Sequence, residues 1–248
     1  MGNLSGKYAV VSGAAKGIGA AIVKRLIQDD IAGVAMLDIN EEQLSSCIAE
    51  LGSTSVTLIP VKCNISSQND VRAAIKKVVE QFGTIDILVN NAGITKDAMF
   101  HKMSYEQWQQ VINVNLNGTF LMCSEVVPIF REKNSGKIVN ISSLSAYGNI
   151  GQANYASTKA ALLGFTATLA KELGPKNINV NAIAPGFIDT DMLSTVPEKV
   201  RESWKAGIPL RRFGSAEELA NIVAFLVSDE SSWISGECIT ASGGVRSL

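Results

Sequence analysis

Residues 7–19 read Lys7-Tyr8-Ala9-Val10-Val11-Ser12-Gly13-Ala14-Ala15-Lys16-Gly17-Ile18-Gly19, and this stretch decides the fold class of the chain. An apolar run leads into three glycines, and a helical pattern follows from Ala20 to Ile27. Glycines at such a junction let the backbone turn tightly and approach a pyrophosphate, while the first amides of the helix attract its negative charge. The spacing departs from the Gly-x-Gly-x-x-Gly dinucleotide fingerprint, so a plain glycine turn between strand and helix is the alternative interpretation.

The rest of the chain alternates strand-like and helical patterns, with no linker-like segment or repeat between them. The strand-like runs are Tyr8–Ser12, Val34–Asp38, Val56–Cys63, Ile85–Asn90, Lys137–Ile141, Ile178–Ala184 and Glu237–Ala241. The helical patterns are Ile18–Asp29, Glu41–Leu51, Asn69–Phe82, Tyr105–Glu132, Tyr155–Leu173 and Ala216–Ser228. Such alternation is typical of parallel strands joined by right-handed crossovers. We therefore predict an α/β fold over residues 1–248, a single-domain Rossmann-type doubly wound sheet of about seven parallel strands with helices on both faces.

The second strand ends in Asp38, near the offset of about 20 residues at which an acid binds the adenosine ribose. Its charge would repel a 2′-phosphate, which favours NAD(H) as the cofactor. Lys16 argues for NADP(H), because a cation beside that pocket would pair with the phosphate. Asp38 is given more weight, since a lysine side chain can swing into solvent. The alternative role of Asp38 is the N-cap of the helix that begins near Glu41.

Tyr155 and Lys159 lie one helical turn apart in the stretch Asn154-Tyr155-Ala156-Ser157-Thr158-Lys159. A phenol ordinarily loses its proton near pH 10, and a nearby positive charge draws that pKa down toward neutrality. The pair therefore predicts a group that transfers protons at neutral pH. The spacing alone is also typical of an ordinary helix surface, so the pair gains its weight from the glycine segment and from Ser142 upstream.

Taken together, these features resemble the short-chain dehydrogenase/reductase family over essentially the whole chain. Ser12–Gly19 looks like the family's glycine motif, and Asn90-Asn91-Ala92-Gly93 is similar to its Asn-Asn-Ala-Gly signature. Pro185-Gly186, after a predicted strand, looks like the family's turn beside the nicotinamide. The resemblance implies an oxidoreductase that interconverts a ketone and a secondary alcohol with NAD(P).

The family's catalytic tetrad would fall on Asn115, Ser142, Tyr155 and Lys159. The resemblance implies that Tyr155 transfers the proton, Ser142 binds the substrate oxygen, Lys159 holds the nicotinamide ribose and Asn115 holds a water. As alternatives, Ser142 would merely end a strand, and Asn115 would be a polar spacer within a long helix. A non-catalytic dinucleotide-binding sensor is the remaining class, and the intact tetrad argues against it.

A closer likeness joins residues 148–155 and 184–192 to bacterial 3-oxoacyl-[acyl-carrier-protein] reductases. It implies a 3-oxoacyl thioester substrate, and the alternative is a hydroxysteroid, polyol or cyclic alcohol. Two arginines that dock the acidic carrier protein in those enzymes would map to Lys133 and Lys176, which keep the charge but lose the bidentate fork. Asp38 also fits poorly, because those reductases mostly use NADPH, and acyl carrier protein is therefore an open partner.

The residues and the resemblance together predict the ligand contacts. The predicted cofactor contacts are Ser12, Gly13, Lys16, Gly17, Ile18, Gly19, Asp38, Ile39, Cys63, Asn64, Asn90, Ala92, Gly93, Tyr155, Lys159, Pro185, Gly186, Ile188 and Thr190. The predicted substrate contacts are Ser142, Leu144, Gln152, Tyr155, Phe187 and Met192. The connection 186–214 is long and mixes apolar with charged residues, so we expect a substrate lid there, with a subunit contact or simple packing as the alternative.

Composition narrows the remaining classes of function. Hydrophobic residues make up 46% of the 248 residues, and the net charge of −1 gives no electrostatic case for nucleic acid or anionic membranes. One histidine, His101, and four scattered cysteines predict neither a metal site nor a serine–histidine hydrolase. The start of the chain shows no signal-peptide pattern, so we expect a cytoplasmic enzyme. The family resemblance and the broadly apolar helices imply a homotetramer.

Overall fold

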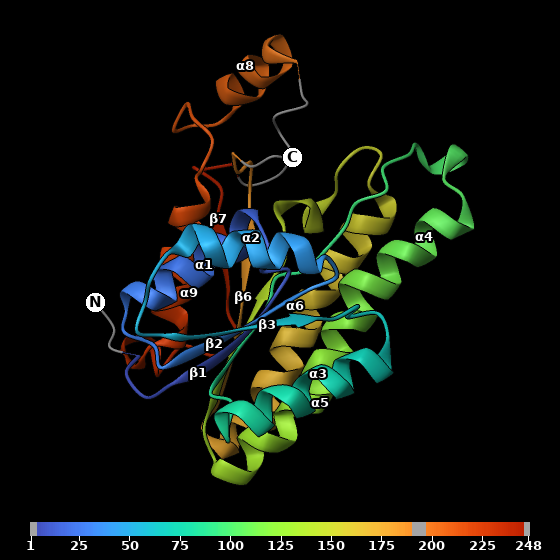
Figure 1. The fold of residues 1–248 in the computed structure, drawn as a ribbon. Helices are drawn as coiled ribbons and strands as arrows, with labels where there is room; N and C mark the ends of the chain where they lie inside the picture. The colour runs from blue at the N-terminus through green and yellow to red at the C-terminus, as the bar shows by residue number, and fades with distance from the viewer. Residues whose placement is uncertain (1–3, 190–196, 246–248) are drawn as a thin grey trace.

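The computed structural model describes residues 4–189 and 197–245, which form a seven-stranded sheet flanked by helices (Figure 1). Every strand pairs in parallel with its neighbours, in the order β3-β2-β1-β4-β5-β6-β7. The strands are β1 Tyr8–Ser12, β2 Gly33–Asp38, β3 Thr57–Lys62, β4 Ile87–Asn90, β5 Gly136–Ile141, β6 Ile178–Pro185 and β7 Cys238–Ala241. This arrangement confirms the predicted doubly wound α/β fold.

The α-helices of the described residues cover both faces of the sheet. They are α1 Gly17–Gln28, α2 Glu41–Leu51, α3 Gln68–Phe82, α4 Tyr105–Ile112, α5 Gly118–Lys133, α6 Ala153–Leu173, α8 Glu198–Gly207 and α9 Ala216–Val227. Figure 1 shows α1, α2 and α9 on one face and α3, α5 and α6 on the other. Within the same residues, no helix is long and apolar enough to cross a membrane.

Alternation along the strands divides the core into two layers. Val10 of β1 packs in the cluster that holds Val126 of α5, whereas the next residue, Val11, packs in the cluster that holds Leu26 of α1. Both valines have no exposed surface. A strand buried on both faces is a near-continuous apolar run, which is why β1 was readable from the sequence.

The helix predicted over Tyr105–Glu132 was wrong in one respect, because the structure divides it. A π-helical turn, Asn113–Asn117, separates α4 from α5 and contains the buried side chain of Asn115. The Asn115 amide binds the main chain of Ile94 in both directions, donating to its carbonyl at 3.0 Å and accepting from its N–H at 2.8 Å. We attribute the wider turn to this tertiary contact, and π turns inside helices often mark functional sites.

The strand order reverses between β1 and β4. From β1 the chain winds outward through β2 to β3, and from β4 it winds the other way through β5 and β6 to β7. The loops after β1 and β4 therefore run in opposite directions from the carboxyl edge of the sheet and leave a crevice between them. In open α/β sheets ligands bind in that crevice.

Candidate active site

The loop between β1 and α1 depends on glycine at two positions. Gly13 has φ +64°, a conformation that side chains disfavour, and a Cβ on Gly19 would lie 2.0 Å from the carbonyl oxygen of Gly13. Any side chain on Gly19 would therefore push the helix start away from the loop. The Asn91 amide Nδ2 fixes the other side of this loop by donating to the carbonyls of Ser12 and Gly13, each at 3.0 Å.

A groove of about 710 Å³ opens between these glycines, the end of β2 and the loop after β4. It combines backbone amides, one carboxylate and an apolar floor, which suits a dinucleotide. Its lining includes ten of the predicted cofactor residues: Gly13, Lys16, Gly17, Ile18, Asp38, Ile39, Cys63, Asn64, Ala92 and Gly93.

Asp38 holds its carboxylate over the loop that follows β1. Its Oδ2 accepts from the N–H of Ala15 at 3.2 Å, and its Oδ1 accepts from the N–H of Asn40 at 3.2 Å. The alternative role as a helix N-cap was wrong, because Asn40 caps α2 by accepting from the N–H of Gln43 at 3.0 Å. Asp38 therefore stays in the groove, while Lys16 at its rim is exposed.

Two predicted cofactor contacts lie in the interior instead. The Ser12 hydroxyl is 1% exposed and accepts from the N–H groups of Asn91 and Ala92. Asn90 is 4% exposed and donates to Asn140 Oδ1 at 2.8 Å. Both side chains point into the protein and support the residues that line the groove, because successive side chains of a strand alternate between its two faces and those at these strand ends face inward. Asn91, which lines the groove, was not among the predicted cofactor contacts. The adjacent pair Asn90-Asn91 was the sequence signal that could have indicated it.

Tyr155 and Lys159 share the first turns of α6, as predicted. The Lys159 Nζ lies 5.5 Å from the centroid of the Tyr155 ring and donates to the carbonyl of Ile141 at 2.7 Å. Burial lowers the pKa of Lys159 to about 8. A Cβ on Gly93 would lie 3.3 Å from Asn115 Oδ1 and 3.4 Å from Lys159 Nζ. Asn115 and Lys159 thus flank Gly93, whose lack of a side chain leaves the space beside both of them open.

The expectation that Lys159 lowers the pKa of Tyr155 was wrong for the free protein. Burial raises the pKa of the Tyr155 phenol, a hydrogen bond with Ser143 lowers it, and the charge of Asp97 raises it again. Desolvation is the largest of these causes and opposes the phenolate. Tyr155 is therefore held as a neutral phenol, the form that donates a proton.

The two serines after β5 have different partners. The Ser142 hydroxyl is 2% exposed and donates to the carbonyl of Lys159 at 2.7 Å. Asn140, two positions earlier, also reaches α6 by donating to Thr166 Oγ1 at 2.9 Å, as strand alternation requires. The serine that bonds to Tyr155 is Ser143. The prediction of Ser142 as the group beside Tyr155 is thus off by one residue.

The predicted substrate residues have different surroundings in the structure. Leu144, predicted as a substrate contact, has a wholly buried side chain in a 3₁₀ turn, Leu144–Tyr147. The Gln152 amide Nε2 donates to Asp97 Oδ2 at 3.0 Å. Phe187 stacks on Trp204 of α8, with 5.1 Å between ring centroids. Thr190 and Met192 lie outside the described residues.

The end of β6 and the segment after it reach the same edge. Pro185 is the last residue of β6 and pairs with Ala241 of β7. A Cβ on Gly186 would lie 2.9 Å from the Cα of Ser242, so only glycine fits that crossing. Ile188 bridges Gly214 and lines a second cavity rather than the groove.

Comparison with known proteins identifies the family to which this fold and site belong. A family model described as Enoyl-(Acyl carrier protein) reductase matches residues 13–246. The chain is 45% identical over 243 residues to the 3-oxoacyl-[acyl-carrier-protein] reductase of Thermotoga maritima, with 98% of each chain covered. It is 43% identical over 244 residues to the reductase of that name from Aquifex aeolicus, again with 98% of each covered. The chain belongs to the short-chain dehydrogenase/reductase family.

Solved structures agree with the membership. The crystal structure of 3-oxoacyl-[acyl-carrier protein] reductase from Brucella melitensis superposes with a TM-score of 0.93 at 33% identity, covering 99% of this chain and 93% of that one. The structure of NAD+-bound xylitol dehydrogenase superposes with a TM-score of 0.93 at 31% identity, covering 97% and 99%. As a short-chain dehydrogenase/reductase, this chain is an oxidoreductase that works with a nicotinamide dinucleotide.

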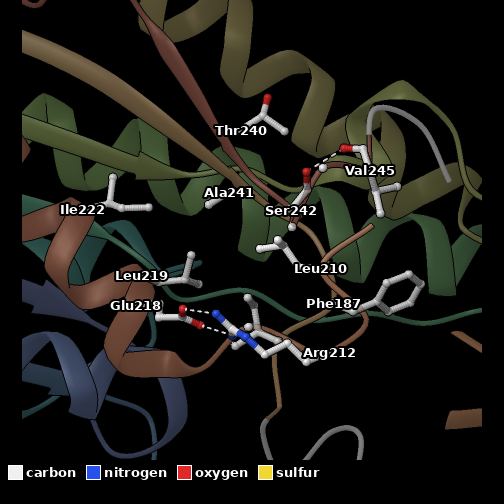
Figure 2. Close-up of a pocket in the computed structure, with 14 residues that line it drawn as sticks. Phe187, Leu210, Arg212, Glu218, Leu219, Ile222, Thr240, Ala241, Ser242 and Val245 are labelled. Atoms are coloured by element: carbon white, nitrogen blue, oxygen red, sulfur yellow. Dashed lines mark hydrogen bonds and ion pairs between the residues drawn. The ribbon is translucent and has the colours of Figure 1, made fainter. Parts of the chain in front are cut away.

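A second cavity of this short-chain dehydrogenase/reductase, about 440 Å³ in volume, lies where β7 ends and α9 begins (Figure 2). Arg212 and Glu218 form a two-pronged ion pair across it, at 2.8 and 2.6 Å, and this bond lowers the pKa of Glu218 to about 2. Phe187, Leu210 and Val245 supply apolar lining. The positive charge of Arg212 in this cavity is thus paired with the negative charge of Glu218.

Lys133, expected to face a carrier protein, is engaged elsewhere. Its Nζ forms an ion pair with Asp86 at 2.5 Å and also donates to the carbonyl of Ile85. Asp86 directly precedes β4, so this lysine lies at the amino edge of the sheet, opposite the groove. Its ammonium stabilises the fold there.

Proposed function

We propose that this protein is a 3-oxoacyl-thioester reductase, which reduces the 3-keto group to a secondary alcohol. The observation that carries the proposal is that Tyr155, Lys159 and Asn115 converge beside a groove suited to a dinucleotide. The substrate class is supported by relatives named 3-oxoacyl-[acyl-carrier-protein] reductase, which are 43–45% identical over nearly the full chain.

The dinucleotide would supply the hydride. The glycine loop that leads into α1 suits its pyrophosphate, because the first N–H groups of a helix attract negative charge. Glycine is required at positions 13 and 19 of this loop, since a Cβ at either position would collide with backbone or amide atoms of the protein. The carboxylate of Asp38 fits a ribose that carries free hydroxyls and would repel a 2′-phosphate. We therefore propose NAD(H) as the preferred cofactor, with the first adenosine-side contacts made by Asp38 and Ile39.

Tyr155 would give its proton to the substrate oxygen as the alkoxide develops. A phenol is protonated at neutral pH, and the raised pKa of Tyr155 extends this form to higher pH, which suits the reductive direction. Ser143 would hold the same oxygen, because its hydroxyl already adjoins that of Tyr155. Lys159 would bind the ribose nearest the reacting carbon, and Asn115 would hold a water beside Gly93 that returns a proton to Tyr155.

The experiment that tests this proposal separates a ketone from an alkene, since the matching family model carries the name of enoyl reductases. Purified protein is incubated with NADH and either acetoacetyl-CoA or crotonyl-CoA, and the products are identified by mass spectrometry. We expect 3-hydroxybutyryl-CoA from the first and unchanged crotonyl-CoA from the second. Reduction of crotonyl-CoA alone would overturn the proposal.

A second candidate function is dehydrogenation of a polyol. The structural likeness to NAD+-bound xylitol dehydrogenase favours it, as does the Asp38 carboxylate at the proposed ribose site. Xylitol oxidation with NAD+ tests this candidate directly.

We also propose a closed homotetramer, with acyl carrier protein as the natural carrier of the substrate. Phe120 on α5 is 56% exposed, and Trp233, in the segment between α9 and β7, is 99% exposed. Large apolar side chains exposed on two different segments favour more than one kind of two-fold contact. Light scattering tests the assembly, and a monomer mass at micromolar concentration would refute it.

A further inference from the structure

Two loops close against each other beside Tyr155. One follows β4 and contains Asp97, and the other leads into α6 and contains Gln152. The N–H of Ala98 donates to the carbonyl of Gly151 at 2.9 Å, and Gln152 Nε2 donates to Asp97 Oδ2 at 3.0 Å. The bonds join segments that are far apart in the sequence, so they set the position of one loop on the other.

The Gln152 amide is fixed at its other end as well. Its Oε1 accepts from the hydroxyl of Ser145 at 3.0 Å and from Asn149 Nδ2 at 2.9 Å. With the oxygen so engaged, the amide nitrogen must face Asp97. The exposed carboxylate of Asp97 is therefore held beside Gln152, which lies three residues before Tyr155 and is the N-cap of α6.

A second anchor lies one residue before Tyr155. Asn154 is wholly buried, and its Nδ2 donates to the carbonyls of Lys96 and Gln107, at 2.9 and 3.2 Å. Its Oδ1 accepts from the N–H of Tyr155 at 2.7 Å. The loop that carries Asp97 is thus joined by three hydrogen bonds to residues on the N-terminal side of Tyr155, namely Gly151, Gln152 and Asn154.

The groups that lie near Tyr155 come from three elements. Lys159 lies on the same helix, Ser143 comes from the loop after β5, and Asp97 comes from the loop after β4. Glu106, on the neighbouring α4, accepts from Gln110 Nε2 at 3.1 Å. A negative charge near a phenol opposes the phenolate, whereas a serine hydroxyl favours it.

We propose that Asp97, oriented by Gln152, is a positioning residue whose negative charge, added to the effect of burial, extends to higher pH the range in which Tyr155 stays in its proton-donating form. This inference rests on the proposed ketone reduction. It assigns to the two loops a function beyond shaping the rim of the site, since together they hold a negative charge near the proton donor. The consequence is that reduction extends to higher pH than it would without the carboxylate.

The test compares the parent with Asp97→Asn, which keeps an oxygen that Gln152 can bond but removes the charge. The first readout is the pH profile of kcat/KM for ketone reduction. The alkaline fall should move to lower pH in the variant, so that the ratio of variant to parent rate declines as the pH rises. Parallel profiles that differ only in KM would show a purely structural clamp and overturn the proposal.

Two further variants sharpen the comparison. Gln152→Ala frees the carboxylate, and we expect the same direction of change together with a raised KM. Glu80→Gln removes an equal charge from the surface of α3, where Glu80 pairs with Lys76 at 3.8 Å, and should leave the profile unchanged. An equal shift in Glu80→Gln would reveal a general effect of net charge and contradict the proposal.

A second readout does not depend on any substrate. The ultraviolet difference titration of tyrosinate is recorded for the parent and for Asp97→Asn, each with its own Tyr155→Phe counterpart subtracted. The Tyr155 component should ionise at lower pH in Asp97→Asn. If the parent reduces no 3-oxoacyl thioester, the proposed function fails while this titration still decides the role of Asp97; coincident titrations would overturn it.

Discussion

The hydroxyl of Ser142 donates to the main-chain carbonyl of Lys159, 2.7 Å away, and both residues are buried. This bond ties the end of β5 to α6 and engages the hydroxyl of Ser142 at the main chain of Lys159. The neighbouring hydroxyl, that of Ser143, bonds to Tyr155 instead. A single step along the backbone therefore separates a serine that supports the fold from one that reaches the reacting groups.

The first prediction concerns these two serines. Ser143→Ala should lower kcat/KM by about 10²-fold, the effect of removing one donor to a developing oxyanion. Ser142→Ala should lower the free energy of unfolding by about 1–2 kcal/mol and change kcat/KM far less, because a buried hydrogen bond is lost. Steady-state kinetics and urea unfolding of both variants check this. The reverse ranking of rates would return the role to Ser142.

The second prediction concerns Tyr155. Tyr155→Phe keeps the ring and its packing but removes the proton donor, so turnover should fall by about 10²–10⁴-fold. Dinucleotide binding, measured by fluorescence titration with NADH, should stay within about twofold of the parent, since the groove is lined by other residues. Rates within about threefold of the parent, below the expected range, would remove Tyr155 from the proton transfer.

The third prediction follows from the buried charge of Lys159. Its pKa is lowered to about 8 from an ordinary value of 10.5, so the unfolded chain binds the proton more tightly than the folded one. Below pH 8 the burial of the charged lysine therefore carries a penalty that lowers the free energy of unfolding by about 3 kcal/mol. Lys159→Met removes it and loses the bond to Ile141, worth about 1 kcal/mol, for a net gain of about 2 kcal/mol at pH 7.

The sign of this effect fixes its pH dependence. Between pH 8 and 10.5 the parent grows more stable as the pH rises, because only its unfolded state holds the proton, so the advantage of Lys159→Met should fade across that window. Urea unfolding at several pH values measures it, with Lys171→Met, an exposed site on the same helix, as the control. An advantage that is absent at pH 7, or constant with pH, would contradict the buried charge.

The fourth prediction concerns cofactor choice. The parent should show the higher kcat/KM with NADH, and Asp38→Ala should narrow the gap to NADPH, because the carboxylate repels a 2′-phosphate. Lys16→Ala should leave the preference for NADH in place, since this exposed side chain lies at the rim of the groove. A parent that prefers NADPH would show that Lys16 outweighs Asp38.

Buried strands were the most predictable part of the fold. β1 occupies Tyr8–Ser12 in the structure, as expected, because a strand covered on both faces must be apolar throughout. α8 was not predicted. Its ten residues Glu198–Gly207 are mostly polar, and it packs through Trp204 on Phe187. Its large apolar residues are only Val200 and Trp204, four positions apart, and its contacts with Phe187 and Phe213 form only in the fold, so the segment gives a helical signal too short to stand out.

The site was predictable to within a residue, and the misses have physical causes. Spacing along a chain cannot say which of two adjacent serines faces a helix, and that choice depends on how β5 is registered against β6. The inward turn of Ser12 and Asn90 follows the same alternation at their strand ends. The raised pKa of Tyr155 required knowledge of its burial, since the sequence displays only the lysine one turn away.

The most direct test of the central claim is the ranking of kcat/KM across candidate substrates in one set of conditions. The panel is acetoacetyl-CoA in reduction, and xylitol, a hydroxysteroid and cyclohexanol in oxidation, each with both cofactors and with Tyr155→Phe as the blank. We expect acetoacetyl-CoA with NADH to rank first and its turnover to disappear in the variant. A polyol, steroid or cyclic alcohol in first place, with acetoacetyl-CoA at the level of the blank, would contradict it.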